Sequence, residues 1–88
     1  MKIKGEFILR EIVGETILVP VGATALEYNG MIIINDTGAY IWKALEQNRT
    51  KEEILYGLTE TYEVSEEEAK KDLDEFLDTL EKAGILER

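Results

Sequence analysis

The side chains that could carry chemistry are carboxylates, lysines, tyrosines, threonines and a single serine, because the chain has no cysteine and no histidine. It therefore lacks a thiolate nucleophile, the commonest general base and the commonest metal ligand. Asp74 and Asp78 could in principle work as a catalytic carboxylate pair. However, acids four residues apart on a helix usually form a solvated face. We therefore expect no enzyme, no metal site and no cofactor, and a binding module is favoured.

The length of 88 residues is that of one small domain, which we assign to residues 1–88. Hydrophobic residues make up 44% and charged residues 33%, which is too apolar for a disordered chain and too charged for a membrane protein. No apolar run approaches the roughly 20 residues that span a bilayer, and Met1 to Gly5 lack the apolar segment of a secretion signal. We expect a domain that folds in water in the cytoplasm.

The net charge of −9 is concentrated in the second half of the chain. Residues 1–49 carry five basic and six acidic side chains, whereas residues 50–88 carry five and thirteen. Such a surface repels DNA and RNA backbones, so the charge-driven part of nucleic-acid affinity is absent. A basic or an apolar peptide is the better partner.

Two strands are predicted near the N-terminus. Phe7 to Ile12 and Thr16 to Val21 are rich in β-branched residues and flank Gly14-Glu15, a link typical of a hairpin. Pro20 lies near the end of the second strand, where a missing backbone donor is tolerated. We expect the two strands to pair in antiparallel fashion.

A third strand is predicted at Met31 to Ile34, after the turn signal Asn29-Gly30. Residues 23–28, which precede this turn, are compatible with a strand or with irregular structure. Four consecutive apolar residues imply that both faces of the third strand are covered, because a half-solvated strand should alternate. Helices and the rest of the chain could cover both faces, or one side or edge could be kept for an added peptide strand.

Two helices are predicted next, where the apolar period changes to about 3.6 residues. The first can be capped by Asn35, Asp36 or Thr37, and its apolar face consists of Ile41, Trp42 and Leu45. Thr50 and Glu53 form a capping-box pattern that starts a second helix from about Lys51 to Tyr62.

A third helix begins after Ser65, which is followed by three glutamates that suit the positive end of a helix dipole. Gly84 is placed to end this helix in a left-handed conformation. Its expected core stripe is Ala69, Leu73, Phe76, Leu80 and Ala83. At 100° per residue Leu77 lies beside this stripe, so it either widens the core or lines a groove. In the second case, Leu77→Arg would impair binding and leave the fold intact.

Three strands followed by three helices predict an α+β domain of winged-helix-like architecture, with an antiparallel sheet and the order βββααα. Fold alone does not define function.

The same segments, in this order and spacing, resemble the PqqD (pyrroloquinoline quinone biosynthesis protein D) family, the stand-alone form of the RiPP recognition element. The matching segments are Phe7 to Val21, Asn29-Gly30-Met31-Ile32-Ile33-Ile34-Asn35-Asp36-Thr37-Gly38, Ile41-Trp42 with Leu45, Thr50-x-x-Glu53-Ile54, Tyr62-x-Val64 and Asp72-x-x-x-Phe76-Leu77-x-x-Leu80-x-x-x-Gly84-Ile85-Leu86. They cover nearly the whole chain.

This resemblance implies a non-catalytic peptide chaperone. It would bind the leader of a ribosomally made precursor peptide as an added antiparallel strand, and present the peptide to a modifying enzyme, often a radical S-adenosylmethionine (radical SAM) enzyme. Carried onto this chain, the strand side of the groove is Met31, Ile32, Ile33, Ile34 and Asn35, and the helix side is Lys70, Leu73, Asp74, Leu77 and Glu81.

Two other classes share some of these features. A winged-helix DNA-binding regulator has this architecture, but a recognition helix with Asp72, Asp74, Glu75 and Asp78 has the wrong sign for phosphates. An acyl carrier protein is also small and acidic, but its attachment serine stands in an Asp-Ser-Leu-type motif. Ser65 follows Val64 and precedes Glu66, and is better explained as a helix cap.

Overall fold

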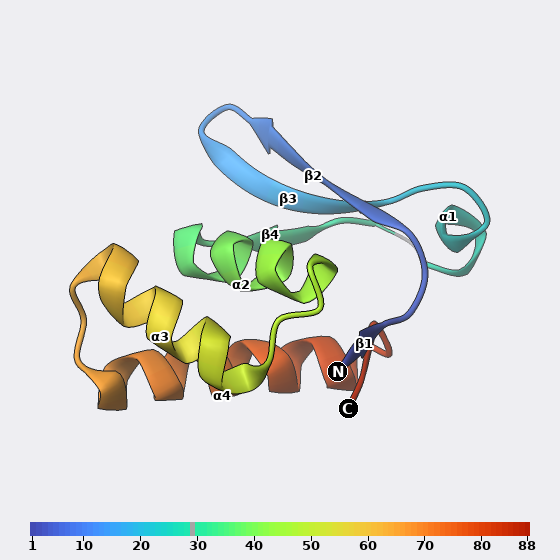
Figure 1. The fold of residues 1–88 in the computed structure, drawn as a ribbon. Coiled ribbons are helices and arrows are strands. Elements are labelled where there is room, and N and C mark those ends of the chain that lie inside the picture. The colour runs from blue at the N-terminus through green and yellow to red at the C-terminus, as the bar shows by residue number, and fades with distance from the viewer. Residues whose placement is uncertain (29) are drawn as a thin grey trace.

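The computed structural model describes residues 1–28 and 30–88 and contains a three-stranded sheet, a two-stranded ribbon and a set of helices (Figure 1). The elements are β1 (Lys2–Ile3), β2 (Phe7–Ile12), β3 (Glu15–Pro20), α1 (Thr24–Glu27), β4 (Ile32–Ile34), α2 (Asp36–Glu46), α3 (Lys51–Tyr62), α4 (Glu66–Lys82) and β5 (Leu86–Glu87). The predicted α+β class and the antiparallel sheet followed by helices are confirmed. Within the described residues, no helix is long and apolar enough to cross a membrane.

The larger sheet has the order β2-β3-β4, with both pairs of neighbours antiparallel. Figure 1 shows α2, α3 and α4 gathered on one side of this sheet. The residues that face the helices include Phe7, Leu18 and Ile34, all of which belong to the hydrophobic core. The strands therefore contribute one face to the core and turn the other face away from the helices.

The hairpin between β2 and β3 turns at Val13 and Gly14, whose φ angles are 50° and 80°. Two consecutive residues with positive φ are the signature of a two-residue type I′ turn, whose twist matches that of the paired strands. The second strand accordingly starts at Glu15, one residue before the predicted start at Thr16, and ends at Pro20. The turn expected at Asn29-Gly30 includes Asn29, which lies outside the described residues.

The predicted helix starts are confirmed by their caps. The Asn35 side chain accepts a hydrogen bond from Gly38 N at 2.8 Å, which begins α2. Thr50 and Glu53 form the complete capping box of α3, with bonds of 2.8 and 3.1 Å. Ser65 accepts from the backbone of Glu68 at the start of α4. These local contacts satisfy amides that would otherwise lack partners.

The end of α4 is a Schellman motif. Gly84 has φ 78°, its N–H donates to Glu81 O at 3.0 Å, and Ile85 N–H donates to Leu80 O at 2.9 Å. The chain then enters β5, which pairs with β1 and brings the two termini side by side (Figure 1). This ribbon and the single turn α1 within residues 23–28 were not predicted.

The core stripe of α4 differs from the predicted stripe. The side chains that are buried are Ala69, Leu73, Leu77 and Leu80. Leu77 is 0% exposed, whereas Phe76 is only partly buried and Ala83 is exposed. The helix is therefore rotated toward Leu77 relative to the predicted orientation. Trp42, at 1% exposed, lies in the core as expected and packs edge-on against Phe7.

Candidate functional site

The strand β4 forms one edge of the three-stranded sheet. On one side it pairs with β3, with Ile17 opposite Ile33 and Leu18 opposite Ile32. Along the part of the chain that the structure describes, no strand pairs with its other side. Alternate residues of an edge strand direct their N–H and C=O groups away from the sheet, where an additional strand can bind them.

The side chains of β4 alternate in burial, although all are apolar. Ile34 is 8% exposed and Ile32 is partly buried, and both pack with the core. Ile33 is 67% exposed and Met31, just before the strand, is 61% exposed. The expectation that both faces of this strand are covered is therefore wrong for the outer face, over which no helix of the described residues lies (Figure 1).

A hollow of about 190 Å³ lies between the start of α2, directly after β4, and one flank of α4. It is lined by Asn35, Thr37, Gly38, Asp72, Glu75, Phe76 and Thr79. Phe76 forms its apolar part: a Cβ on Gly38 would lie 3.0 Å from the Phe76 ring and 3.3 Å from Ile34 Cβ. The ring thus lies close to both α2 and the end of β4.

The polar groups around this hollow are acidic or uncharged. Asp72 and Glu75 supply two carboxylates, and none of the residues that line the hollow is basic. The Asn35 side chain is used within the chain, because its Oδ1 accepts from Gly38 N and from Thr37 Oγ1. Thr79 Oγ1 donates to the carbonyl of Glu75 at 2.9 Å. The hollow therefore suits an apolar or a basic side chain.

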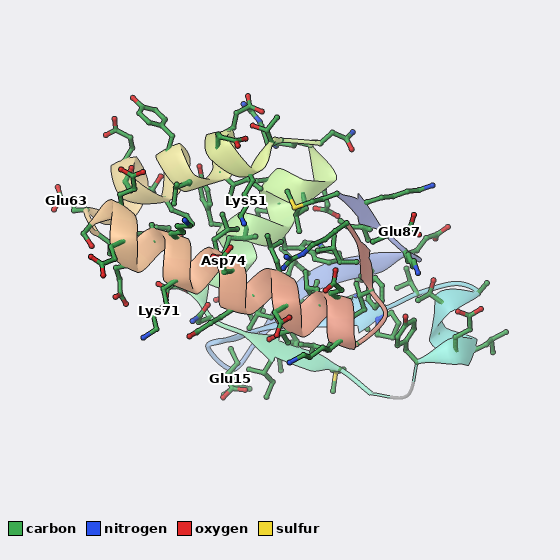
Figure 2. The ribbon with its side chains drawn as sticks, turned by 90° about the horizontal axis from the view of Figure 1, so that it is seen from below. Glu15, Lys51, Glu63, Lys71, Asp74 and Glu87 are labelled. Carbon is green, nitrogen blue, oxygen red and sulfur yellow. The ribbon has the colours of Figure 1, made fainter. Side chains whose placement is uncertain are left out.

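The opposite flank of α4, on which the sequence placed the groove, faces other elements. Asp74 Oδ1 lies 2.7 Å from Lys51 Nζ of α3, and the Glu81 carboxylate lies 3.6 Å from the Arg88 guanidinium. Figure 2 shows Asp74 and Lys51 pointing toward each other and Lys71 pointing away from α3. Lys70 is exposed on the Asp74 flank, where its charge helps lower the pKa of that residue.

Leu73 and Leu77 are fully buried and lie in the core rather than beside it. Leu77 borders a hollow of about 560 Å³ together with residues of the chain start, α3 and the C-terminus, away from β4. The placement of Leu77 beside the core is therefore wrong, and we now expect Leu77→Arg to disrupt the fold, because the guanidinium would be forced into the core. Of the predicted site residues, Met31 to Asn35 thus lie at the edge strand β4 or next to it. The predicted helix side lies in the core or on the flank of α4 that faces α3 and the C-terminus, not beside β4.

The pair of Lys51 and Asp74 also has an electrostatic signature. The hydrogen bond from Lys51 has the largest effect and holds the pKa of Asp74 below its usual range. Burial opposes this shift, and the charges of Lys51, Lys70 and Arg88 each lower the pKa further by a smaller amount. Both side chains are about 44% exposed, so solvent weakens the pair. This pair ties α3 to α4 and takes no part in the hollow beside β4.

Asp72, Glu75, Phe76 and Thr79 were not among the site residues predicted from the sequence. The spacing of Leu73, Leu77 and Leu80 is compatible with the observed orientation of α4, but the sequence alone does not select it over a core stripe that includes Phe76. In the structure the centre of the buried face lies further from Phe76 than predicted. Phe76 then falls at the edge of the core, and Asp72, Thr79 and Glu75 follow beyond it on the same flank.

Comparisons with known proteins identify the family and a protein of similar fold. The family model described as Coenzyme PQQ synthesis protein D (PqqD) matches residues 7–86. The structure of TbiB1 in complex with the TbiA(beta) leader peptide is similar to this one, with a TM-score of 0.75 and 26% sequence identity. The similarity covers 99% of this chain and 95% of TbiB1. No curated protein matches the sequence.

Proposed function

Because the chain belongs to the PqqD family, we propose that it is a peptide chaperone that binds the leader of a ribosomally made precursor peptide. The observation that carries this proposal is the edge of β4 that pairs with none of the described strands and lies beside the hollow at Phe76. The fold is shared with TbiB1, which was solved in complex with a leader peptide. Binding by strand addition would give affinity through main-chain hydrogen bonds and selectivity through side-chain pockets.

We propose that the strand side of the site is Met31 to Asn35, as the sequence indicates. For the helix side, the burial of Leu73 and Leu77 and the contact of Asp74 with Lys51 favour the other flank of α4. That flank consists of Asp72, Glu75, Phe76 and Thr79. An apolar leader side chain would pack on Phe76, and a basic neighbour would meet the two carboxylates.

The domain would act without catalysis of its own, by holding the leader while a separate enzyme modifies the rest of the peptide. We propose that this enzyme belongs to the radical S-adenosylmethionine class and that both work in the cytoplasm. Family membership supports this step. Co-purification of the domain with a radical enzyme encoded beside it, in the presence of the precursor, would test it.

The binding site is tested with a synthetic peptide that spans the leader of the precursor encoded beside this gene. Thr79 is exposed on the proposed groove flank, so Thr79→Arg should block the groove and leave the core unchanged. We expect isothermal titration to show at least tenfold weaker binding, about 1.4 kcal/mol. Thr61→Arg makes the same change at an exposed position of α3 and should have no effect.

Amide NMR shifts locate the peptide independently of these variants. We expect the largest shifts at residues 31–35 and 72–79. Shifts confined to the β2–β3 hairpin or to α3 would contradict the proposed groove even if binding occurred. No binding of the leader at millimolar concentration would contradict the proposed function itself.

A further inference from the structure

The face of the three-stranded sheet that is turned away from the helices is largely apolar. The register places Ile8 of β2 opposite Val19 of β3, and Ile17 of β3 opposite Ile33 of β4. Ile8 is 38% exposed, Ile12 47% and Ile33 67%. Ile17 is buried, but neither it nor the other apolar residues of this face belong to the cluster that packs against the helices. We call the residues Ile8, Ile12, Ile17, Val19 and Ile33 the outer patch.

The outer patch is unusual for a sheet face that meets water. An antiparallel sheet with one solvated face normally carries polar residues there. In this sheet Ile17 is only 6% exposed, although Figure 1 shows no helix over this side. Its neighbours on the sheet must therefore cover it. A contiguous apolar surface of this kind marks an interaction site.

Two charged residues, Arg10 and Glu15, complete this face, and they have opposite signs. Arg10 lies beside Ile17, and Glu15 lies beside Ile12. Neither takes part in an ion pair found among the described residues. The rest of the acidic charge lies mainly on α3 and α4, on the opposite side of the sheet (Figure 1). The outer face is therefore close to neutral on a strongly acidic chain.

We propose that the outer patch binds a second copy of this chain, with two sheets packed face to face about a twofold axis. The axis lies between the two sheets, along the diagonal that joins Ile12 and Ile17. Rotation about it places Arg10 of one copy over Glu15 of the other. Arg10 of each copy would then meet Glu15 of the other, and Val19 would meet Ile33. The strands of the two sheets would cross at a steep angle, as in orthogonal sheet packing.

Charge favours a second copy as the occupant of this face. The patch is complementary to itself, because its two opposite charges occupy positions that the axis exchanges. The arrangement also places the acidic helices of both copies on the outside of the dimer, far from each other. The edge of β4 points sideways in the plane of the sheet, so each copy would keep it accessible. The inference does not depend on what binds at that edge.

Sedimentation velocity and light scattering, from about 1 µM to about 1 mM protein, test the dimer. We expect wild-type protein to shift from monomer to dimer over this range. Arg10→Glu and Glu15→Arg should each raise the dissociation constant at least tenfold. The double variant R10E/E15R should return it to within threefold of wild type, because the exchanged charges would pair again.

Two controls separate this pairing from the effect of net charge. Lys71→Glu and Glu67→Arg, both at exposed positions of α4, change the net charge as the two patch variants do and should leave the dimer unchanged. Circular dichroism should show an unchanged fold for all variants, because each replaced side chain is exposed. Wild-type protein that stays monomeric at 1 mM would overturn the proposal and would indicate that a different protein binds this face. A double variant that stays as weak as the single variants would overturn it too.

Discussion

Phe76 of α4 lies so close to Gly38 of α2 that a Cβ on the glycine would come 3.0 Å from the phenyl ring. The same Cβ would lie 3.1 Å from Oδ1 of Asn35, the residue that caps α2. The glycine therefore lets α4 approach the end of β4 and sets the position of the ring beside the proposed groove.

We expect Gly38→Ala to displace Phe76 and to destabilise the domain by about 1 kcal/mol. Overpacking costs about 1–3 kcal/mol, and the better helix propensity of alanine offsets up to about 1 kcal/mol of it. Replacing the ring with a smaller side chain in the double variant G38A/F76L should recover part of the lost stability. Urea denaturation can measure this recovery. The double variant G38A/L26A is the control. Leu26 is 89% exposed and remote from Gly38, so the effects of the two changes on stability should add. Additive effects for Gly38 and Phe76 would contradict the contact.

The helix caps were predictable because each depends on residues within four positions of one another. Thr50 with Glu53 and Ser65 with Glu68 form in the structure as their spacing indicates. Tertiary packing, in contrast, decides which flank of α4 faces β4. Phe76 and Leu77 are both apolar and lie 100° apart, so the sequence allows either to join the core.

The pairing of β1 with β5 was not predictable for a different reason. Each strand has two residues, and Ile3 pairs with Leu86 at the other end of the chain. Two residues show no alternation that would indicate a strand, and nothing local joins segments so far apart. The bounds of the two hairpin strands and of α3 depend on residues that are near in sequence, and they were predicted to within one residue.

The burial of Leu77 predicts a strong effect on stability. Leu77→Ala should cost about 2–5 kcal/mol, because it leaves a cavity at a position that is 0% exposed. We expect Leu77→Arg to unfold the domain, as Trp42→Ala should at about 3–5 kcal/mol. Urea denaturation followed by circular dichroism measures these losses. Leu26→Ala makes the same change as Leu77→Ala on the surface and should stay within about 0.5 kcal/mol of wild type. A stable Leu77→Arg protein would show that the face of α4 is misassigned.

The ion pair of Lys51 and Asp74 predicts a pH-dependent contribution to stability. The pKa of Asp74 is lowered in the folded state, mainly by the hydrogen bond from Lys51. The contribution is therefore present above the unfolded pKa of about 4 and is lost as pH falls through the folded pKa. Because both side chains are well exposed, we expect Lys51→Met to cost at most about 1 kcal/mol at neutral pH.

Carboxyl NMR titration checks this prediction directly. In Lys51→Met the pKa of Asp74 should rise toward its usual range, and the stability difference from wild type should vanish as pH falls through the lowered pKa of Asp74 in the wild-type protein. Lys71→Met removes a lysine that points away from α3 and should leave the pKa of Asp74 unchanged (Figure 2). Equal effects of the two variants would mean that net charge, and not the pair, sets this pKa.

The tip of the β2–β3 hairpin offers a stabilising change. Val13 has φ 50° and is 97% exposed, so a β-branched residue adopts a left-handed conformation without packing in return. Type I′ turns favour Asn-Gly, and Gly14 already occupies the second position. We expect Val13→Asn to raise stability by about 1 kcal/mol, which corresponds to about 4–8 °C in Tm. Asn48, with φ 57°, allows the reverse test, and Asn48→Val should lower Tm by a similar amount. An unchanged Tm in Val13→Asn would show that the valine conformation carries no cost at this turn.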